Sequence, residues 1–255
     1  MAPIKDNSSN LFMNPESGLT RNVIKCNHAL LTPDGHVASV LPGWTNCTSH
    51  VLISASLGAG FSQFLISLEA RTAGHGETGN DEWFLYIVAG KAKVNGSILA
   101  QGGFAYLPPQ TGYEIHGVVK GSQLLIFKKT YEPLPGQKTP EFYIGDEKKI
   151  PETPFLGDPH ARLKTLIPDS LAQDMAVNIF TYDPGATLPF VETHVMEHGM
   201  LFLSGGGVYR LDADWYPVMA GDAIWIAPYC PQWFIAAGPQ PARYIYYKDI
   251  NRLPK

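Results

Sequence analysis

The sequence is poor in charge and has no concentrated charge of either sign. Charged residues make up 16% of the 255-residue chain, against roughly 25% in an average soluble domain. The net charge is −4 at pH 7, and no basic block or stripe occurs. Because proteins that bind nucleic acids present clustered lysines and arginines to the phosphate backbone, we expect no nucleic-acid partner.

Long apolar runs and paired cysteines are also missing. No segment approaches the roughly 18 apolar residues that span a bilayer, so we expect no membrane partner. The first residues, MAPIKDNSSN, lack the charged and then apolar pattern of a secretory signal. Cys26, Cys47 and Cys230 are an odd and widely spaced set, which is no disulfide framework and fits a reducing compartment. We therefore expect a cytoplasmic protein.

Glycine and proline, by contrast, are abundant, with 25 and 21 residues. Together with 45% hydrophobic and 11% aromatic residues, they are typical of short strands joined by tight turns and exclude a disordered chain. Strand-like patterns occupy 84–94, 200–211, 222–228 and 243–249. We expect an all-β sandwich or barrel, with one short helical piece near 168–174.

An internal repeat divides the chain into two halves. Three residues of the first half recur 115 positions later, so that Glu77, Glu82 and Gly90 match Glu192, Glu197 and Gly205. Further along, residues 125–135 (LIFKKTYEPLP) match residues 244–254 (YIYYKDINRLP) without a gap, at a spacing of 119. The spacing changes in one loop, between Gly90 and Gly102, where insertions are tolerated. We infer a tandem duplication of one barrel of about 125 residues.

The repeat predicts four parts of the chain. They are an N-terminal extension with the first strands (1–43), an N-terminal barrel (44–135), a connection (136–165) and a C-terminal barrel (166–255). The connection is rich in proline and charge and could contribute an edge strand of its own.

One cluster of side chains points to chemistry. In a strand, residues two apart share a face, so Glu192, His194 and His198 would point the same way and Glu197 the opposite way. A carboxylate and two imidazoles that converge inside a barrel form a site for a borderline or hard divalent metal. The alternative without chemistry is a pair of surface histidines on a loop.

The same residues match the H-x-x-E-H pattern of zinc peptidases. That chemistry requires a helix, which brings the two histidines to one face. Here Pro184-Gly185 and Pro189 precede the motif, and Gly199 follows it. These residues disfavour a helix, so we do not expect a peptidase.

The spacing resembles the two motifs of the cupins. Glu192-x-His194-x3-His198-x6-Gly205 is similar to the first motif, with the ligand types permuted. Gly221-x5-Ala227-x-Tyr229-x2-Gln232 is similar to the second, with Gln232 in place of a histidine and departures at Ala227 and Tyr229. A tandem cupin with the strings ETHVMEHG and PQW resembles the (S)-ureidoglycine aminohydrolase family, the bicupins of allantoin degradation. The similarity includes the segments 29–35, 207–218 and 247–252.

The resemblance implies a fold of two tandem jelly-roll-like cupin barrels and one Mn²⁺ per chain in the C-terminal cupin. Carried over, the metal ligands are Glu192, His194, His198 and Gln232, and the substrate-binding residues are Glu192, Gln232, Tyr244 and Lys248. Glu192 and Lys248 are the implied catalytic residues.

The reaction that the resemblance implies converts (S)-2-ureidoglycine and water to (S)-ureidoglycolate and ammonia in allantoin (purine) catabolism. The partner would be this small-molecule substrate, and the protein would form homo-oligomers. In plants the family enters the endoplasmic reticulum through a leader that is then removed.

The first half does not repeat the ligand set. The positions of Glu192, His194, His198 and Gln232 are taken by Glu77, Gly79, Trp83 and Tyr113. We expect Trp83 and Tyr113 to fill the barrel. A second metal site could instead involve His75, Glu77, Glu82 and His116, although Glu82 and His116 fall outside the matching register. Tyr244 and Lys248 correspond to Leu125 and Lys129.

Two other classes of function remain as alternatives. A bicupin oxidoreductase or decarboxylase acting on a small carboxylate or a phenolic usually carries three histidines and one glutamate, often in both halves. A non-catalytic binding or storage cupin generally lacks the ligand set. We expect Cys230 to be a small buried thiol and Glu197 to lie behind the site.

Overall fold

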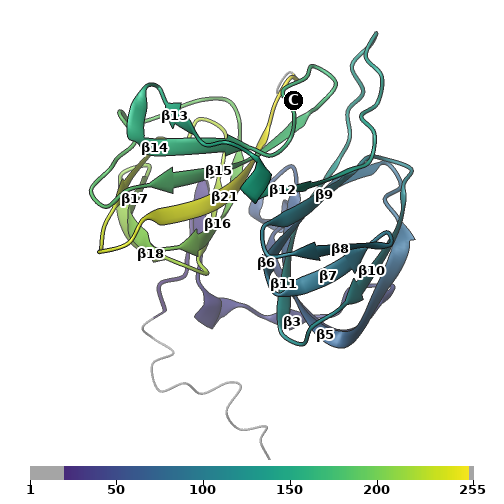
Figure 1. Ribbon diagram of the computed structural model, residues 1–255. Coiled ribbons are helices and arrows are strands. Elements are labelled where there is room, and N and C mark those ends of the chain that lie inside the picture. Colours follow the sequence, from purple (N-terminus) through teal and green to yellow (C-terminus); the bar gives the residue numbers. More distant parts are fainter. Residues whose placement is uncertain (1–19, 253–255) are drawn as a thin grey trace, which may run out of the picture.

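The computed structural model describes residues 20–252. Residues 1–19 of the predicted N-terminal extension therefore lie outside the described residues. Residues 253–254, at the end of the repeat, also lie outside them. The all-β prediction is confirmed, because the described residues form two β-barrels that lie side by side (Figure 1). Their helical parts are the 3-10 turns η2 (Pro33–Gly35), η3 (Ala55–Leu57) and η4 (Glu147–Lys149). No helix among these residues is long and apolar enough to cross a membrane.

The prediction of a short helix near residues 168–174 is wrong. This segment forms turns, in which the Ser170 Oγ accepts the Ala172 amide at 3.2 Å and the Ser170 carbonyl accepts the Gln173 amide at 3.0 Å. A serine side chain that captures a nearby backbone amide offers the chain an alternative to a helix.

The N-terminal barrel is built on one large sheet. Its path runs β12-β9-β6-β11-β5-β10-β7-β8, with β4 on the other side of β5 and β3 on β4. The strands are β3 (Ala38–Ser39), β4 (Trp44–Ile53), β5 (Ser62–Glu77), β6 (Asp81–Ala89), β7 (Lys91–Val94), β8 (Ser97–Ala100), β9 (Gly103–Leu107), β10 (Gly112–Gly117), β11 (Ser122–Thr130) and β12 (Tyr143–Asp146). Their alternation places one set of apolar side chains in the barrel interior and the other toward the second barrel.

The C-terminal barrel is formed by two sheets, with paths β1-β2-β19-β16-β21-β15-β14-β13 and β18-β17-β20. Its strands are β1 (Val23–Ile24), β2 (His28–Leu31), β13 (Thr153–Phe155), β14 (Asp158–Thr165), β15 (Met175–Tyr182), β16 (His198–Ser204), β17 (Gly206–Leu211), β18 (Asp214–Met219), β19 (Ala223–Ile226), β20 (Gln232–Ala236) and β21 (Ala242–Asp249). The strands predicted over 84–94, 200–211, 222–228 and 243–249 are all present.

Strand pairing crosses the parts that the repeat predicts. β2, from the N-terminal extension, pairs with β19 in the C-terminal barrel, and β12, from the connection, pairs with β9 in the N-terminal barrel. β13 and β14, also from the connection, extend the C-terminal sheet. Because an unpaired strand edge is prone to aggregation, β2 protects the edge of β19 by occupying it.

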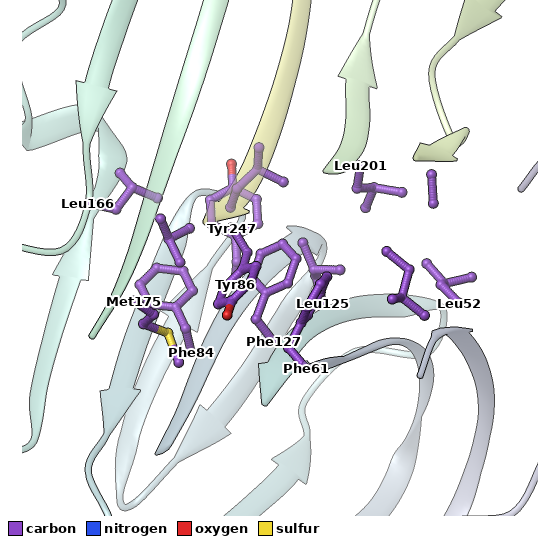
Figure 2. Packing of buried hydrophobic residues seen from close by; sticks show 14 of the residues in the cluster. Leu52, Phe61, Phe84, Tyr86, Leu125, Phe127, Leu166, Met175, Leu201 and Tyr247 are labelled. Carbon is purple, nitrogen blue, oxygen red and sulfur yellow. The ribbon is translucent and has the colours of Figure 1, made fainter. Parts of the chain in front are cut away.

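An apolar core joins the two barrels (Figure 2). Phe61 of the N-terminal barrel stacks on Tyr247 of β21 with ring centroids 4.1 Å apart, and Phe127 lies 5.9 Å from the same ring. Burial of each such side chain stabilises the fold by about 1.5–3 kcal/mol. The opposite face of β21 points into the C-terminal barrel, so the shared core fixes the strand that carries Tyr244 and Lys248.

Strand pairing corrects two correspondences of the repeat. Trp83 pairs with Lys128 on β11, whereas its counterpart His198 pairs with Lys248 on β21. Lys128, and not Lys129, is therefore the counterpart of Lys248. Both ladders are irregular at the same place of the repeat, because the residues skipped in the pairing are Val88 on β6 and Leu203 on β16. The one-residue difference therefore arises before β11 and β21, where the second half has one residue more between Gln232 and Lys248 than the first half has between Tyr113 and Lys128. In the same way Leu124, and not Leu125, is the counterpart of Tyr244, because Leu124 pairs with Ile87 and Tyr244 with Phe202. A slip of one residue exchanges the two faces of a strand, and Leu125 accordingly faces the second barrel.

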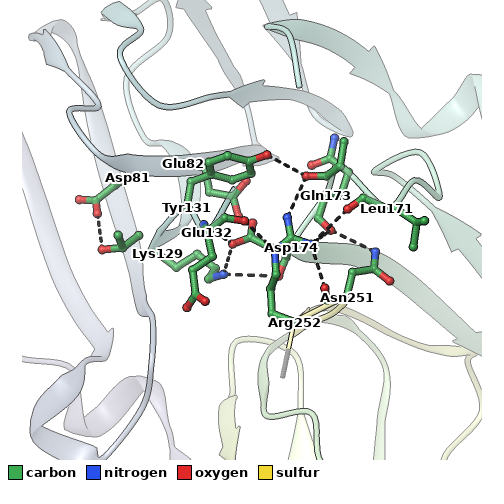
Figure 3. A network of polar contacts seen from close by, with 12 residues as sticks. Asp81, Glu82, Lys129, Tyr131, Glu132, Leu171, Gln173, Asp174, Asn251 and Arg252 are labelled. Carbon is green, nitrogen blue, oxygen red and sulfur yellow. Dashed lines mark hydrogen bonds and ion pairs between the residues drawn. The ribbon is translucent and has the colours of Figure 1, made fainter. Parts of the chain in front are cut away.

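A buried polar network lies where the two barrels meet (Figure 3). The Lys129 Nζ lies 2.5 Å from the Asp174 Oδ2, and the Tyr106 hydroxyl donates to the Glu82 Oε2 at 2.6 Å. Burial, and then the neighbouring Asp174, raise the pKa of Glu82 well above its usual value. The folded protein therefore keeps a proton on Glu82 at a pH where the unfolded chain has lost it.

The contribution of Glu82 to the stability of the protein should decline as the pH rises above about 4, and Glu82→Gln should remove this part of the pH dependence. The unfolded carboxyl ionises near pH 4.3, so the stabilising contribution of protonated Glu82 is complete below that pH and is lost as the pH rises toward the folded pKa. Urea unfolding at several pH values measures the slope. Glu77→Gln, at an exposed position, is the matched control, and identical slopes in wild type and Glu82→Gln would contradict this assignment.

Candidate functional site

A cavity of about 220 Å³ opens in the C-terminal barrel, and all six predicted site residues line it. They are Glu192, His194, His198, Gln232, Tyr244 and Lys248. The rest of the wall is mainly apolar or aromatic, with Phe155, Phe180, Met196, Met200, Tyr209 and Tyr246. The site combines a few polar groups with an apolar wall, as small-molecule sites do.

The prediction of a regular strand over residues 192–198 is wrong, although the side chains of Glu192, His194 and His198 do converge on one cavity. β16 begins only at His198, and Glu192 forms an isolated bridge with Gln232. In that bridge the Glu192 amide donates to the Gln232 carbonyl at 2.8 Å, and the Gln232 amide donates back at 2.9 Å. The bridge places Glu192 beside Gln232 without a continuous ladder. The segment is also not helical, so the arrangement of a zinc peptidase is absent here.

The two histidines face each other across the cavity. Their Nε2 atoms are 3.1 Å apart. The Nδ1 of His194 lies 3.0 Å from the Met196 carbonyl, and the Nδ1 of His198 lies 3.3 Å from the Tyr247 carbonyl. These carbonyls assign the proton of each ring to Nδ1. The lone pairs of the two Nε2 atoms then face each other and repel, and a cation bound between them would remove this repulsion. Histidines that bind metals are oriented in the same way, with the other ring nitrogen bonded to a carbonyl.

Burial keeps both imidazoles neutral, which is the form that binds a metal. It lowers the pKa of His198 to about 3, with a further contribution from His194, and it also lowers the pKa of His194. The Glu192 carboxyl lies in the same apolar surroundings, and burial raises its pKa against the opposing charge of Lys248.

The donor set fits a divalent metal with nitrogen and oxygen ligands. Gln232 is the third group beside the two histidines, with its Nε2 3.2 Å from the His194 Nε2. A carboxamide binds a metal through its oxygen, so a flip of this amide, which exchanges Oε1 and Nε2, would present the ligand atom to the two imidazoles. Its Oε1 accepts the Tyr209 hydroxyl at 2.8 Å. Within residues 20–252 no group of three or more His, Cys, Asp or Glu side chains has the close spacing of a metal cluster. Glu192 thus lines the cavity without closing such a cluster.

Tyr244 and Lys248 reach the cavity from β21. The Tyr244 hydroxyl lies 3.4 Å from the Tyr182 hydroxyl in the barrel interior. Lys248 lies opposite His198 in the strand pairing and is half-buried at the wall. The pattern of alternation therefore brings a hydroxyl and an ammonium to the same cavity as the two imidazoles.

Glu197 points away from the cavity, as its position in the sequence predicts. Its carboxylate accepts the Gly60 amide at 2.9 Å and the Trp225 Nε1–H at 3.2 Å, both outside the cavity wall. Burial raises the pKa of Glu197 to about 7. Cys230 is buried and does not line the cavity, and burial raises the pKa of its thiol to about 11. It is the small buried thiol that we expected.

The N-terminal barrel fills the equivalent space with aromatic rings, as expected. Trp83 and Tyr113 have ring centroids 4.8 Å apart. Tyr113 pairs with Gly76, so Gly76, and not Glu77, is the counterpart of Glu192. A Cβ atom at Gly76 would lie 2.9 Å from the Tyr113 hydroxyl oxygen, which leaves no room for a ligand side chain.

The alternative metal site of the first half is not assembled. His75, Glu77 and His116 are exposed. Glu82 is fully buried and faces Tyr106 at the junction of the barrels. These four side chains therefore do not share a cavity.

Comparisons with known proteins agree with this geometry. Residues 178–247 match the family model of the cupin domain. The (S)-ureidoglycine aminohydrolase of Arabidopsis thaliana is 38% identical over 244 residues, which cover 93% of this chain and 80% of that protein. This chain belongs to the (S)-ureidoglycine aminohydrolase family.

Solved structures support the fold of this family member. The crystal structure of YlbA from Escherichia coli has a TM-score of 0.82 and 33% identity, and the match covers 95% of this chain and 99% of that one. Oxalate decarboxylase from Bacillus subtilis has a TM-score of 0.67 at 10% identity, covering 88% of this chain and 78% of that one. The second likeness shows the bicupin fold alone.

Sequence reasoning missed one residue that this (S)-ureidoglycine aminohydrolase family member places at the site. Tyr209 on β17 is fully buried, and its hydroxyl donates to the Gln232 Oε1. An aromatic residue in an alternating strand is normally a packing residue, so nothing in the pattern distinguishes it. Its contact with Gln232 could be found only once β17 and β20 were paired.

Tyr209→Phe should weaken metal binding while preserving the fold. The change removes the only hydroxyl that holds the Gln232 amide among the described contacts. Loss of a group that orients a ligand costs about 10–100-fold in metal affinity. Titration with Mn²⁺, followed by electron paramagnetic resonance, measures the change. Unaltered affinity would show that Tyr209 only packs in the barrel.

Proposed function

We propose that this protein catalyses the conversion of (S)-2-ureidoglycine and water to (S)-ureidoglycolate and ammonia, a step of allantoin (purine) catabolism. The relative in Arabidopsis thaliana carries the name of this activity. The observation that carries the proposal is that two facing imidazoles, a carboxyl, an amide and an ammonium line one and the same cavity.

Mn²⁺ is the metal that we propose for this cavity, one per chain. Glu192, His194, His198 and Gln232 would hold it, as a mixed nitrogen and oxygen set without thiolate. The metal would supply Lewis-acid chemistry and a template for the substrate. This proposal is supported by the two Nε2 lone pairs and by the neutral state of both rings.

Ureidoglycine carries a carboxylate, an amine and a ureido group on one carbon. Lys248 would bind the carboxylate by a charge-assisted hydrogen bond, and the Tyr244 hydroxyl would fix the orientation of the substrate. The bond from the carbon to the amine breaks and a bond to a water oxygen forms. Glu192 would take a proton from the water and return one to the departing amine, which leaves as ammonia.

Assays of ammonia and dioxygen on freshly generated (S)-ureidoglycine distinguish this proposal from a bicupin oxidoreductase. One ammonia per ureidoglycolate, with no dioxygen consumed, is the expected result. Dioxygen uptake with oxalate or a phenolic, and no ammonia from ureidoglycine, would favour the oxidoreductase. Ligand binding without either reaction would favour a non-catalytic cupin.

We also propose that the protein is cytoplasmic and forms homo-oligomers. The odd, unpaired cysteines support the first proposal. Size-exclusion chromatography with light scattering tests the second, and a monomer at micromolar concentration would contradict it.

A further inference from the structure

A second cavity, of about 460 Å³, lies between the barrels and has two histidines in its wall. His36 follows η2 in the N-terminal segment, and His50 lies in β4. Leu65 and Val88 from the N-terminal barrel and Leu201 from β16 supply apolar wall. The cavity is as large as many small-ligand sites, which are about 300–1,000 Å³. It shares no residue with the cavity of the candidate active site.

Each of these histidines has a buried ring nitrogen without a hydrogen-bond partner. The atoms are the His36 Nε2 and the His50 Nδ1. The rings lie 5.5 Å apart between centroids, with 37° between their planes. The two histidines of the candidate active site have a comparable spacing of 4.8 Å. Because a buried polar atom without a hydrogen-bond partner destabilises the folded state, a ligand that satisfies both nitrogens would stabilise the protein.

The chemistry of the wall selects the kind of ligand. The donors that the wall offers are the unpartnered ring nitrogens of the two histidines. No carboxylate or thiolate lines the cavity among the described residues. Oxygen-seeking ions such as Mg²⁺ and Ca²⁺ therefore lack their ligands here, whereas imidazole suits Zn²⁺, Ni²⁺ and Cu²⁺.

We propose that His36 and His50 form a second metal site, for a nitrogen-preferring divalent ion of the Zn²⁺, Ni²⁺ and Cu²⁺ class. The polar side chains of Ser67 and Gln123 lie in the same wall, and they and solvent would complete the ligand shell. His36 belongs to the segment whose β2 pairs with the C-terminal barrel, and His50 belongs to the N-terminal barrel. A bound ion would thus clamp the N-terminal segment onto the junction of the two barrels.

Nickel binding to the full-length protein tests this proposal independently of catalysis. In a His194→Ala/His198→Ala background, which lacks the imidazoles of the candidate active site, we expect a Ni²⁺ equivalent by calorimetry. Adding His36→Asn and His50→Asn should lower that affinity by about tenfold or more. Adding His75→Asn and His116→Asn instead, at two exposed positions, is the matched control and should change little.

Thermal unfolding provides a second readout. Ni²⁺ should raise the Tm of the background protein and of the control by mass action, and it should not raise the Tm of the protein that lacks His36 and His50. Ammonia release by a His36→Asn/His50→Asn protein with intact His194 and His198 should remain. Equal Ni²⁺ affinity with and without His36 and His50, or a background protein that binds no Ni²⁺, would overturn the second site and leave the proposed reaction untouched.

Discussion

Lys248→Met is expected to abolish most ammonia release while the metal stays bound. The substitution keeps the apolar stem of the side chain and removes the ammonium that would neutralise the substrate carboxylate. Loss of one partner of a desolvated, hydrogen-bonded charge pair costs about 2–5 kcal/mol. Since each 1.4 kcal/mol is a factor of ten, kcat/KM should fall by about 30-fold or more. Steady-state assays and metal analysis of the same preparation measure both quantities.

Lys128→Met is the matched control for this prediction. Lys128 occupies the equivalent strand position in the N-terminal barrel, where its Nζ lies 3.0 Å from Asp81 and 5.4 Å from the Trp83 ring. It lines no part of the candidate active site, so its loss should leave turnover near the wild-type value. Equal effects of the two substitutions would mean that Lys248 acts through general charge or stability.

His194→Ala and His198→Ala are each expected to remove both the bound metal and the activity. Each change deletes one of the two facing nitrogen ligands, and the remaining set of an amide, a carboxyl and one imidazole should hold Mn²⁺ weakly. His194 is the sharper choice because it is only half-buried, so its truncation disturbs the core less. Metal content and ammonia release should fall together.

The control for the histidine variants is His160→Ala. His160 is exposed and pairs with Asp183 at the surface, at 3.0 Å, where ion pairs contribute little. Its removal should leave metal content and ammonia release unchanged. A His194→Ala protein that remained folded, lost the metal and kept its turnover would separate the metal from the reaction.

Some of the site could be predicted because the relevant signal is local. Alternation of strand residues pointed to His198, and the resemblance to the (S)-ureidoglycine aminohydrolase family supplied Gln232, Tyr244 and Lys248. The path between Glu192 and His198 could not be predicted in the same way. It depends on a bridge to Gln232, 40 positions away, which no periodicity of residues 192–198 encodes.

In the fold, too, the features set by nearby residues could be predicted, whereas the pairing of distant strands could not. The duplication is visible in the sequence, and the strands of both barrels follow from its alternating patterns. The pairing of β2 with β19 and of β12 with β9 joins segments from different parts of the repeat. The second half also has one residue more than the first between β20 and β21, so an ungapped alignment placed Lys129 where the strand pairing has Lys128.

Reconstitution of the metal-stripped protein tests the central claim most directly. Protein freed of metal by chelation should release no ammonia from (S)-ureidoglycine, and one equivalent of Mn²⁺ per chain should restore turnover together with (S)-ureidoglycolate formation. Full activity of the stripped protein, or no ammonia release from a chain that has bound its Mn²⁺, would contradict the assignment of this cavity as a manganese-dependent ureidoglycine site.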